Sequence, residues 1–364
     1  MKTTAPHIPF EATHPGILIN DELEARGDIK QKELAQLLGI NPSQLNEIIK
    51  GKRPITADLA ILLEKSLEIP ADYWMRFQTQ YEINCARIKE KNITKLSLIE
   101  TWNTIKQYVP ISYLKKQDYL TESLTENINK IKAIYNVSTI SELANRCTSQ
   151  KFAFYKKSEK LKIDPKNMLA WSCVAEYEAQ QQVATTTFNS NTIEELTEKL
   201  NVIFFENKNT IYAVQNTLNQ YGIKCVVVKK LEKTPVDGYS FWSHNNPAIA
   251  VSLRHTRIDN FAFTIMHEIG HIALHLSNNK GQKFLNFDTN EINKYETEAN
   301  TFAQTSLIAT NTWHAINANY SPLSHDKLLA ASKCYAIHPA IIKGRASYEN
   351  NNYTTATAFN SKLN

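Results

Sequence analysis

The sequence predicts a mainly α-helical protein of the α+β class. Three observations carry this expectation: short helical segments separated by glycine and proline in residues 15–93, Leu/Ile periodicity almost without glycine in 94–200, and strand-like runs only from residue 223 onward. The 364 residues exceed the roughly 250–300 that a single hydrophobic core serves, so we expect two or three domains.

The first region predicts five short helices. Glycine follows Arg26, Leu38 and Lys50, which is where helices stop. After the second helix, Asn41 is placed to cap the third and Pro42 suits its first position. A fourth helix is expected over residues 56–67 and a fifth from residue 71. The side chains expected to face the core of these helices are Leu34, Leu37, Leu38, Leu45, Ile48, Ile49, Leu59, Leu62 and Leu63.

This order of helices predicts a helix-turn-helix whose second helix, residues 42–50, enters the major groove of double-stranded DNA. The outward residues of that helix are the expected base readers, because Gln and Asn amides pair with adenine; they are Ser43, Gln44, Asn46 and Glu47. Phosphate contacts are expected from flanking residues, namely Gln31, Lys32, Lys50, Lys52 and Arg53. The alternative is a helical bundle with an ordinary polar surface.

Residues 14–90 resemble the HigA-type antitoxin family of regulators. The resemblance rests on His14-Pro15-Gly16, Leu34-Ala35, Gly39-Ile40, the stretch from Leu45 to Arg53, and Trp74 with Gln78 and Tyr81. It implies binding to operator DNA as a homodimer. Lys30-Gln31 stands where the family commonly has Ser-Gln, which alters one expected phosphate contact.

The region 94–200 is expected to be a helical connector. Its lysine-rich segment 151–166, interleaved with aromatic residues, favours a solvated helical surface over a nucleic-acid contact. Residues 223–228 and 248–253 cluster β-branched side chains and predict a small sheet. The full division is an arm over 1–14, the DNA-binding domain over 15–93, the connector, a metallopeptidase domain over 201–346, and a disordered tail over 347–364.

The segment MHEIGHIALH, residues 266–275, predicts a zinc-binding helix. His267 and His271 are four residues apart and so share one helix face, while Glu268 between them is placed to act as general base. Gly270 inside the helix indicates that another element packs closely against its backbone. We expect His275, one turn further, to lie at the surface or behind a ligand rather than to bind Zn2+ itself.

A third ligand is needed, because catalytic zinc takes three protein ligands and keeps a fourth position for water. The downstream segment Tyr295-Glu296-Thr297-Glu298-Ala299-Asn300 offers Glu296 or, alternatively, Glu298. Asn300, one turn after Glu296, is placed to brace a ligating histidine.

HEIGHIALH followed by ETEANTFA is similar to the ImmA/IrrE family of zinc metallopeptidases, and the resemblance extends over about residues 200–345. It also includes Ser252-Leu253-Arg254, Ile337-His338-Pro339 and Gly344-Arg345. It implies a zincin-like domain with a small sheet packed on the HExxH helix, and it favours Glu296 over Glu298. Residues 306–310 depart from the family, which puts the local substrate groove in doubt.

Composition sets wider bounds. The five cysteines are scattered and never at CxxC spacing, so neither a disulfide framework nor a cysteine zinc site is indicated. A net charge of +5 permits nucleic-acid binding without requiring it. No apolar run approaches the roughly 20 residues that span a bilayer and no signal peptide is evident, so we expect a cytoplasmic protein without a membrane partner.

Together these features predict a DNA-binding, antitoxin-like regulator with a zinc-dependent endopeptidase domain that acts on a repressor or a toxin-type protein. The alternative is a repressor or antitoxin whose zinc domain is a sensor or docking module without turnover.

Overall fold

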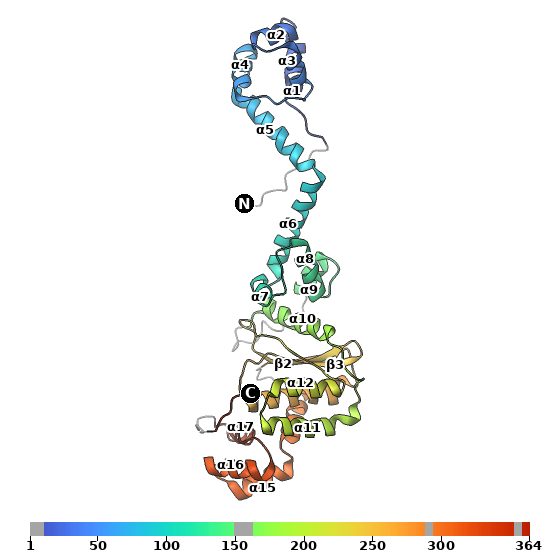
Figure 1. The fold of residues 1–364 in the computed structure, drawn as a ribbon, viewed down its shortest axis with the longest axis vertical. Coiled ribbons are helices and arrows are strands. Elements are labelled where there is room, and N and C mark those ends of the chain that lie inside the picture. Colours follow the sequence, from blue (N-terminus) through green and yellow to red (C-terminus); the bar gives the residue numbers. More distant parts are fainter. Residues whose placement is uncertain (1–10, 149–162, 288–293, 353–358) are drawn as a thin grey trace. The chain divides into compact units, whose positions relative to one another are not determined.

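Helices predominate and one small sheet lies in the C-terminal half, as the sequence predicts (Figure 1). The computed structural model describes residues 11–148, 163–287, 294–352 and 359–364. The chain divides into two units, Met1–Trp102 and Asn103–Asn364. None of the helices in the described ranges is long and apolar enough to cross a membrane.

The first unit contains the predicted five helices: α1 (Gly16–Arg26), α2 (Gln31–Leu37), α3 (Pro42–Ile49), α4 (Ala57–Leu67) and α5 (Ala71–Ile88). A further helix, α6 (Glu90–Tyr108), follows. Leu34, Leu45 and Trp74 are fully buried in the core of the first unit. Two expected core residues are exposed instead, Leu37 by 61% and Leu62 by 41%. Ala35 and Ala60 are buried on these helices, because small side chains let neighbouring backbones approach closely.

His14, which the predicted arm over 1–14 includes, belongs to this core. The buried His14 ring accepts a hydrogen bond at Nδ1 from the Gly16 amide and packs edge-on against Tyr81. A Cβ atom on Gly16 would lie 2.0 Å from the Ile48 carbonyl oxygen. Only glycine therefore allows α1 to approach the end of α3 this closely.

Gln78 on α5 holds the segment that leads into α4. Its amide is 4% exposed; Oε1 accepts a 3.0 Å hydrogen bond from the Ile55 amide, and Nε2 donates to Glu82. The backbone N–H of Ile55 is thereby satisfied inside the core.

The described part of the connector is helical: α7 (Ile111–Lys116), α8 (Leu124–Ile134), α9 (Ile140–Thr148) and α10 (Pro165–Gln181). The lysine-rich segment predicted over 151–166 lies almost entirely outside the described residues. After α10 come a short 3-10 helix, η2 (Ser190–Thr192), and then α11 (Ile193–Glu206) and α12 (Thr210–Gln220).

The sheet has four strands in the order β1-β3-β2-β4. β1 (Lys224–Val227) pairs in parallel with β3 (Asn246–Val251), whereas β2 (Val236–Ser243) pairs antiparallel with both β3 and β4 (Lys283–Phe287). The sequence predicts β1 and β3 but misses β2 and β4. β2 contains a glycine and polar residues, and β4 is a short edge strand; neither has the β-branched cluster used as the signal.

Helices cover both faces of the sheet (Figure 1). On one face α10 packs through Trp171, whose indole lies beside Tyr239 and whose Nε1 donates to the Val228 carbonyl. The alternate residues of β2 and β4, Ser240 and Phe284, pair with each other and face α13 (Ile258–His271) on the opposite side. The HEIGH segment of α13 thus lies directly against β2 and β4.

α13 ends in a π-helical turn, η3 (Ile272–Leu276), and packs against α14 (Lys294–Leu307). The contact is close at Gly270, where a Cβ atom would lie 3.1–3.2 Å from Phe302 and Ala299. This is the close approach that the glycine predicts. Three helices complete the unit: α15 (Thr310–Tyr320), α16 (His325–Tyr335) and α17 (Pro339–Glu349).

For the residues described at the end of the chain, the structure corrects the expectation of a disordered tail over 347–364. The Ile258 amide donates to Ser361, the Leu363 amide donates to Thr256, and the Thr210 amide donates to Asn364. These bonds satisfy backbone groups at the start of α13 and α12, which gives residues 361–364 an ordered place that their composition does not indicate.

We predict that Gln78→Leu destabilises the first unit by about 1–3 kcal/mol, because it leaves the buried Ile55 amide without an acceptor. Hydrogen–deuterium exchange of the α4 amides in the intact chain measures the effect. Gln80→Leu, at an exposed position on the same helix, is the matched control and should leave exchange unchanged. Equal protection in both variants would contradict the assignment.

Candidate metal centre and DNA-binding surface

α13 presents two imidazoles to one point. His267 and His271, one helical turn apart, are 1% and 0% exposed, and their Nε2 atoms lie 3.0 Å from each other. Their rings meet at 80°, so both lone-pair directions reach the same small volume. The spacing of four residues places both histidines on one helix face, and their burial restricts the movement of the rings.

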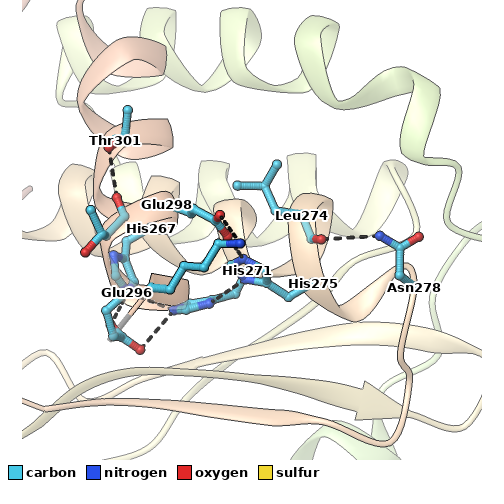
Figure 2. Close-up of polar contacts among 10 residues, drawn as sticks. His267, His271, Leu274, His275, Asn278, Glu296, Glu298 and Thr301 are labelled. Carbon is cyan, nitrogen blue, oxygen red and sulfur yellow. Dashed lines mark hydrogen bonds and ion pairs between the residues drawn. The ribbon is translucent and has the colours of Figure 1, made fainter. Parts of the chain in front are cut away.

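α14 supplies a carboxylate to the same volume from its first turn (Figure 2). The Glu296 oxygens lie 3.2 Å from His267 Nε2 and 3.4 Å from His271 Nε2, and the three donor groups fall within 4.8 Å of one another. Ligand atoms around a tetrahedral zinc ion are separated by roughly 3.3 Å, as follows from metal–ligand distances of about 2.0–2.1 Å. The three groups therefore match a zinc-sized cation in spacing.

The hydrogen bonds behind the rings also favour a cation. His267 Nδ1 lies 2.9 Å from Asn300 Oδ1, an acceptor, so the ring proton sits on Nδ1 and Nε2 keeps its lone pair. His271 Nδ1 faces His275 Nδ1 at 3.1 Å. Glu298, the alternative ligand, meets His275 rather than the His267/His271 pair, with Oε2 3.0 Å from Nε2.

Burial and neighbouring charges shift the pKa values of Glu296, His271 and His267. Burial raises the pKa of Glu296, but hydrogen bonds and charge from His267 and His271 outweigh it and hold that pKa at about 2. Burial lowers the pKa of His271. For His267 the same burial is outweighed by the neighbouring carboxylates, and its pKa is raised. An ionised Glu296 beside nitrogen lone pairs is the donor set that Zn2+ prefers.

Glu268 occupies a hollow in the sheet. Its carboxylate is fully buried and makes no hydrogen bond within the described residues, and this burial raises the pKa of Glu268 to about 8. The room for it comes from Gly238 on β2, where a Cβ atom would lie 2.2 Å from Glu268 Oε1. The charge of His267 and, after it, the Ser240 hydroxyl oppose this rise in the pKa of Glu268.

Aromatic rings enclose the histidines. Phe284 on β4 stacks on His271, with ring centroids 4.3 Å apart and planes 12° apart. Phe263 lies beside His267. Sequence reasoning misses Gly238, Ser240 and Phe284, because their strands are not predicted and their contacts with α13 are long-range.

The segment at residues 306–310, where the chain departs from the ImmA/IrrE pattern, follows the far end of α14. Ser306 is ten residues after Glu296, or about 15 Å along a helix. Its carbonyl accepts from Asn201, and Arg345 donates to the Gln304 and Ile308 carbonyls. This part of the chain therefore caps a helix end well away from the histidines.

The predicted DNA-reading residues lie on α3 and beside it. Leu45 and Ile48 are buried, so Ser43, Asn46 and Glu47 are left on the outer side, with Lys50 one turn further. Two of the predicted readers already have partners: Gln44 Oε1 accepts from the Asn41 amide at 3.1 Å, and Glu47 pairs with Arg53.

The predicted phosphate-binding residues flank this helix. Lys32, Lys52 and Arg53 are exposed, and Gln31 is the first residue of α2. Lys30 stands at the cap position of α2 and offers no acceptor; Glu33 accepts from its amide instead.

We predict that Gly238→Ala forces Glu268 from its hollow and destabilises the second unit by about 1–3 kcal/mol. Urea unfolding measures the cost, and Gly281→Ala, where a Cβ atom meets only an ordinary contact, is the control. In a Glu268→Ala background the cost should largely vanish, because the clashing carboxylate is gone. Additive costs in the double variant would show that Gly238 serves some other purpose.

Comparisons with known proteins match both halves of the chain. The signature of the helix-turn-helix family matches residues 22–74, and that of the IrrE N-terminal-like domain, a peptidase M78 family whose members are generally zinc-dependent, matches residues 219–332. Virulence-associated protein I of Dichelobacter nodosus is 31% identical over 90 residues, covering 25% of this chain and 83% of the relative. The HTH-type transcriptional regulator YbaQ of Escherichia coli K12 is 30% identical over 90 residues, covering 24% and 79%.

Two similar solved structures are HigA proteins. An addiction module antidote protein of the HigA family from Coxiella burnetii shares 32% identity, covers 24% of this chain and 95% of its own, and has a TM-score of 0.23. The Pseudomonas aeruginosa antitoxin HigA, solved with the higBA promoter, shares 32% identity over 21% and 84%, with a TM-score of 0.20. The chain belongs to the helix-turn-helix family of DNA-binding regulators, and it joins that module to an IrrE N-terminal-like domain of peptidase family M78.

Proposed function

We propose that this protein is an antitoxin-like transcriptional regulator whose C-terminal domain is a zinc-dependent endopeptidase acting on a repressor or toxin-type protein. One observation carries the peptidase half: His267, His271 and Glu296 converge within 4.8 Å, and the adjacent Glu268 carboxylate is buried without a hydrogen-bond partner among the described residues. Acceptors that converge at this spacing can hold a cation, and a buried carboxylate beside them matches a general base.

In this proposal His267, His271 and Glu296 hold Zn2+, and Asn300 braces His267. Zinc bound there supplies Lewis acidity, which polarises a peptide carbonyl and makes water acidic enough to attack near neutral pH. Glu268 accepts the proton of the attacking water and delivers it to the leaving amine.

β4 offers a place for the substrate. It is an edge strand, with β2 as its one strand neighbour in the described sheet. Phe284 on this strand stacks on His271, so a peptide extended along the outer side of β4 would pass beside the histidines. An unfolded or looped segment of a protein partner fits this edge better than a compact surface does.

The DNA-binding half of the proposal rests on the helix-turn-helix family and on the charge around α3. Ser43, Gln44, Asn46 and Glu47 would read base edges, with Gln31, Lys32, Lys50, Lys52 and Arg53 on phosphates. We propose a homodimer on a two-fold operator, because two recognition helices one DNA turn apart match such a site. A regulator of this kind acts where its operator is, in the cytoplasm.

A second candidate is a repressor or antitoxin whose zinc domain senses or docks without turnover. The observation that favours it is the complete burial of Glu268, which is 0% exposed in the hollow of β2. Both candidates share the same metal ligands and differ in whether water reaches Glu268.

For the peptidase, we expect one zinc per chain by elemental analysis and cleavage of a proteome-derived peptide library or of proteins encoded beside its gene. Glu268→Gln should keep the zinc and lower the rate by at least about 100-fold, because it removes the proton acceptor. Zinc without cleavage in either form would leave the sensor candidate. A zinc content near zero would refute both metal-dependent candidates.

For DNA, we expect the protein to retard its own promoter and to lose that binding in a Gln44→Ala, Asn46→Ala double variant. Gln80→Ala with Asn84→Ala, a matched amide pair on α5, is the control. Lys50→Ala should weaken binding on all sequences and reduce the log–log salt slope by about one. Sequence-specific binding retained by the α3 double variant would rule out this recognition helix.

A further inference from the structure

A second set of polar contacts runs away from the metal ligands. His271 Nδ1 lies 3.1 Å from His275 Nδ1, and His275 Nε2 lies 3.0 Å from Glu298 Oε2 (Figure 2). Lys294, one turn before Glu298, approaches the same carboxylate at 3.7 Å. Lys294, Glu298 and His275 thus form a chain of contacts from α14 to the Nδ1 atom of His271.

The chemistry of the groups fixes the direction of the protons along this chain. An ionised Glu298 is acceptor only, so His275 Nε2 carries a proton and donates it. A neutral His275 then has a bare Nδ1, which accepts from His271 Nδ1–H. His271 is left with its lone pair on Nε2, 3.0 Å from His267 Nε2 and 3.4 Å from Glu296.

We propose that His275 and Glu298 are positioning residues that hold His271 in the tautomer and orientation in which Nε2 binds the metal. This inference rests on the proposed zinc site and extends it. Glu296 and Glu298, which the sequence leaves as alternatives, would then have separate roles on α14: the first meets the metal, and the second meets the imidazole behind a ligand.

Burial and packing support a fixed relay. We expected His275 to lie either at the surface or behind a ligand. It is 6% exposed, which favours the position behind a ligand. Tyr295 packs edge-on against its ring at a centroid distance of 4.9 Å, while Phe284 stacks on His271. Each ring has an aromatic neighbour, so rotation of either one would break a packing contact as well as a hydrogen bond.

The relay completes a symmetrical support. His267 is braced by Asn300 and His271 by the His275–Glu298 pair; Glu296, Glu298 and Asn300 all come from α14 between residues 296 and 300, whereas His275 comes from η3. Partners of this kind commonly fix the tautomer of a ligating imidazole and raise its basicity.

If the role of Glu298 were to stabilise the fold, its removal would lower the unfolding midpoint of the metal-free protein. Glu298 is 40% exposed on its side chain and its partner Lys294 is 84% exposed, and ion pairs with such exposure contribute little to stability. Removing the Glu298 charge should therefore leave the unfolding midpoint of the metal-free protein almost unchanged. Its effect should appear in metal binding.

The test measures zinc affinity of the full chain by competition with a chromophoric chelator. We expect Glu298→Gln and His275→Phe each to weaken Zn2+ binding by about 10–100-fold, with His275→Phe the more severe. The double variant should be no weaker than His275→Phe alone, because Glu298 acts through His275. Glu195→Gln, which removes a carboxylate from an exposed pair on α11, and His314→Phe, at an exposed position on α15, are the matched controls.

The visible spectrum of the Co2+-loaded protein gives a second readout. Both relay variants should change the ligand-field bands, because His271 no longer holds one orientation, whereas the controls should match the parent. Zinc affinity within about twofold of the parent in Glu298→Gln and His275→Phe, together with an unchanged Co2+ spectrum, would overturn the proposal.

The outcomes separate this inference from the proposed function. Zinc binding weakened in the relay variants, with no cleavage by the parent, would support the relay and refute the peptidase. Cleavage by the parent, with unaltered zinc affinity in the relay variants, would support the peptidase and refute the relay.

Discussion

The close contact between α13 and α14 at Gly270 is the constraint on which the rest of the metal centre depends. With no side chain at that position, the α14 backbone at Ala299 comes within van der Waals reach of α13. Three side chains of α14 then reach three histidines of α13 and η3: Glu296 toward His267 and His271, Asn300 toward His267, and Glu298 toward His275. A larger residue at 270 would separate the helices and break all four pairings together.

The sheet contributes the other half of the environment. β2 provides a hollow at Gly238 for Glu268 and a hydroxyl at Ser240, while β4 lays Phe284 on His271. The opposite face of the same strands is tied to the connector, where Glu176 of α10 accepts from the Tyr239 hydroxyl and the Lys283 ammonium. The strands are thus fixed on one face, while Phe284 on their other face stacks on the proposed metal ligand His271. A shift of the connector would reach the site through two strands rather than through a loop.

Much of this organisation is predictable from the chain, and the failures have physical causes. The helix-turn-helix and the HEIGH helix follow from local periodicity and caps. Leu37 and Leu62 were placed inward by spacing alone, but the way neighbouring helices cross gives the interior to Ala35 and Ala60. The strands β2 and β4 lack β-branched runs, so the sequence does not predict them or the hollow at Gly238. Spacing also left Glu296 and Glu298 open, since only the crossing of α13 and α14 decides which carboxylate meets which imidazole. The ligand set itself stays a prediction that the geometry supports.

The proposed ligands lie on two helices, so an ion between His271 and Glu296 would join positions 25 residues apart and close the loop between them. Closing a long loop removes conformational freedom from the unfolded chain, which is how cross-links stabilise proteins. An ion that binds the folded state alone adds RT ln(1 + [L]/Kd), or about 2.7 kcal/mol when the free ion is at 100 times its dissociation constant. The lifetime of the domain against proteolysis would then follow the supply of the metal in the cell, whether or not the site ever cuts a peptide bond.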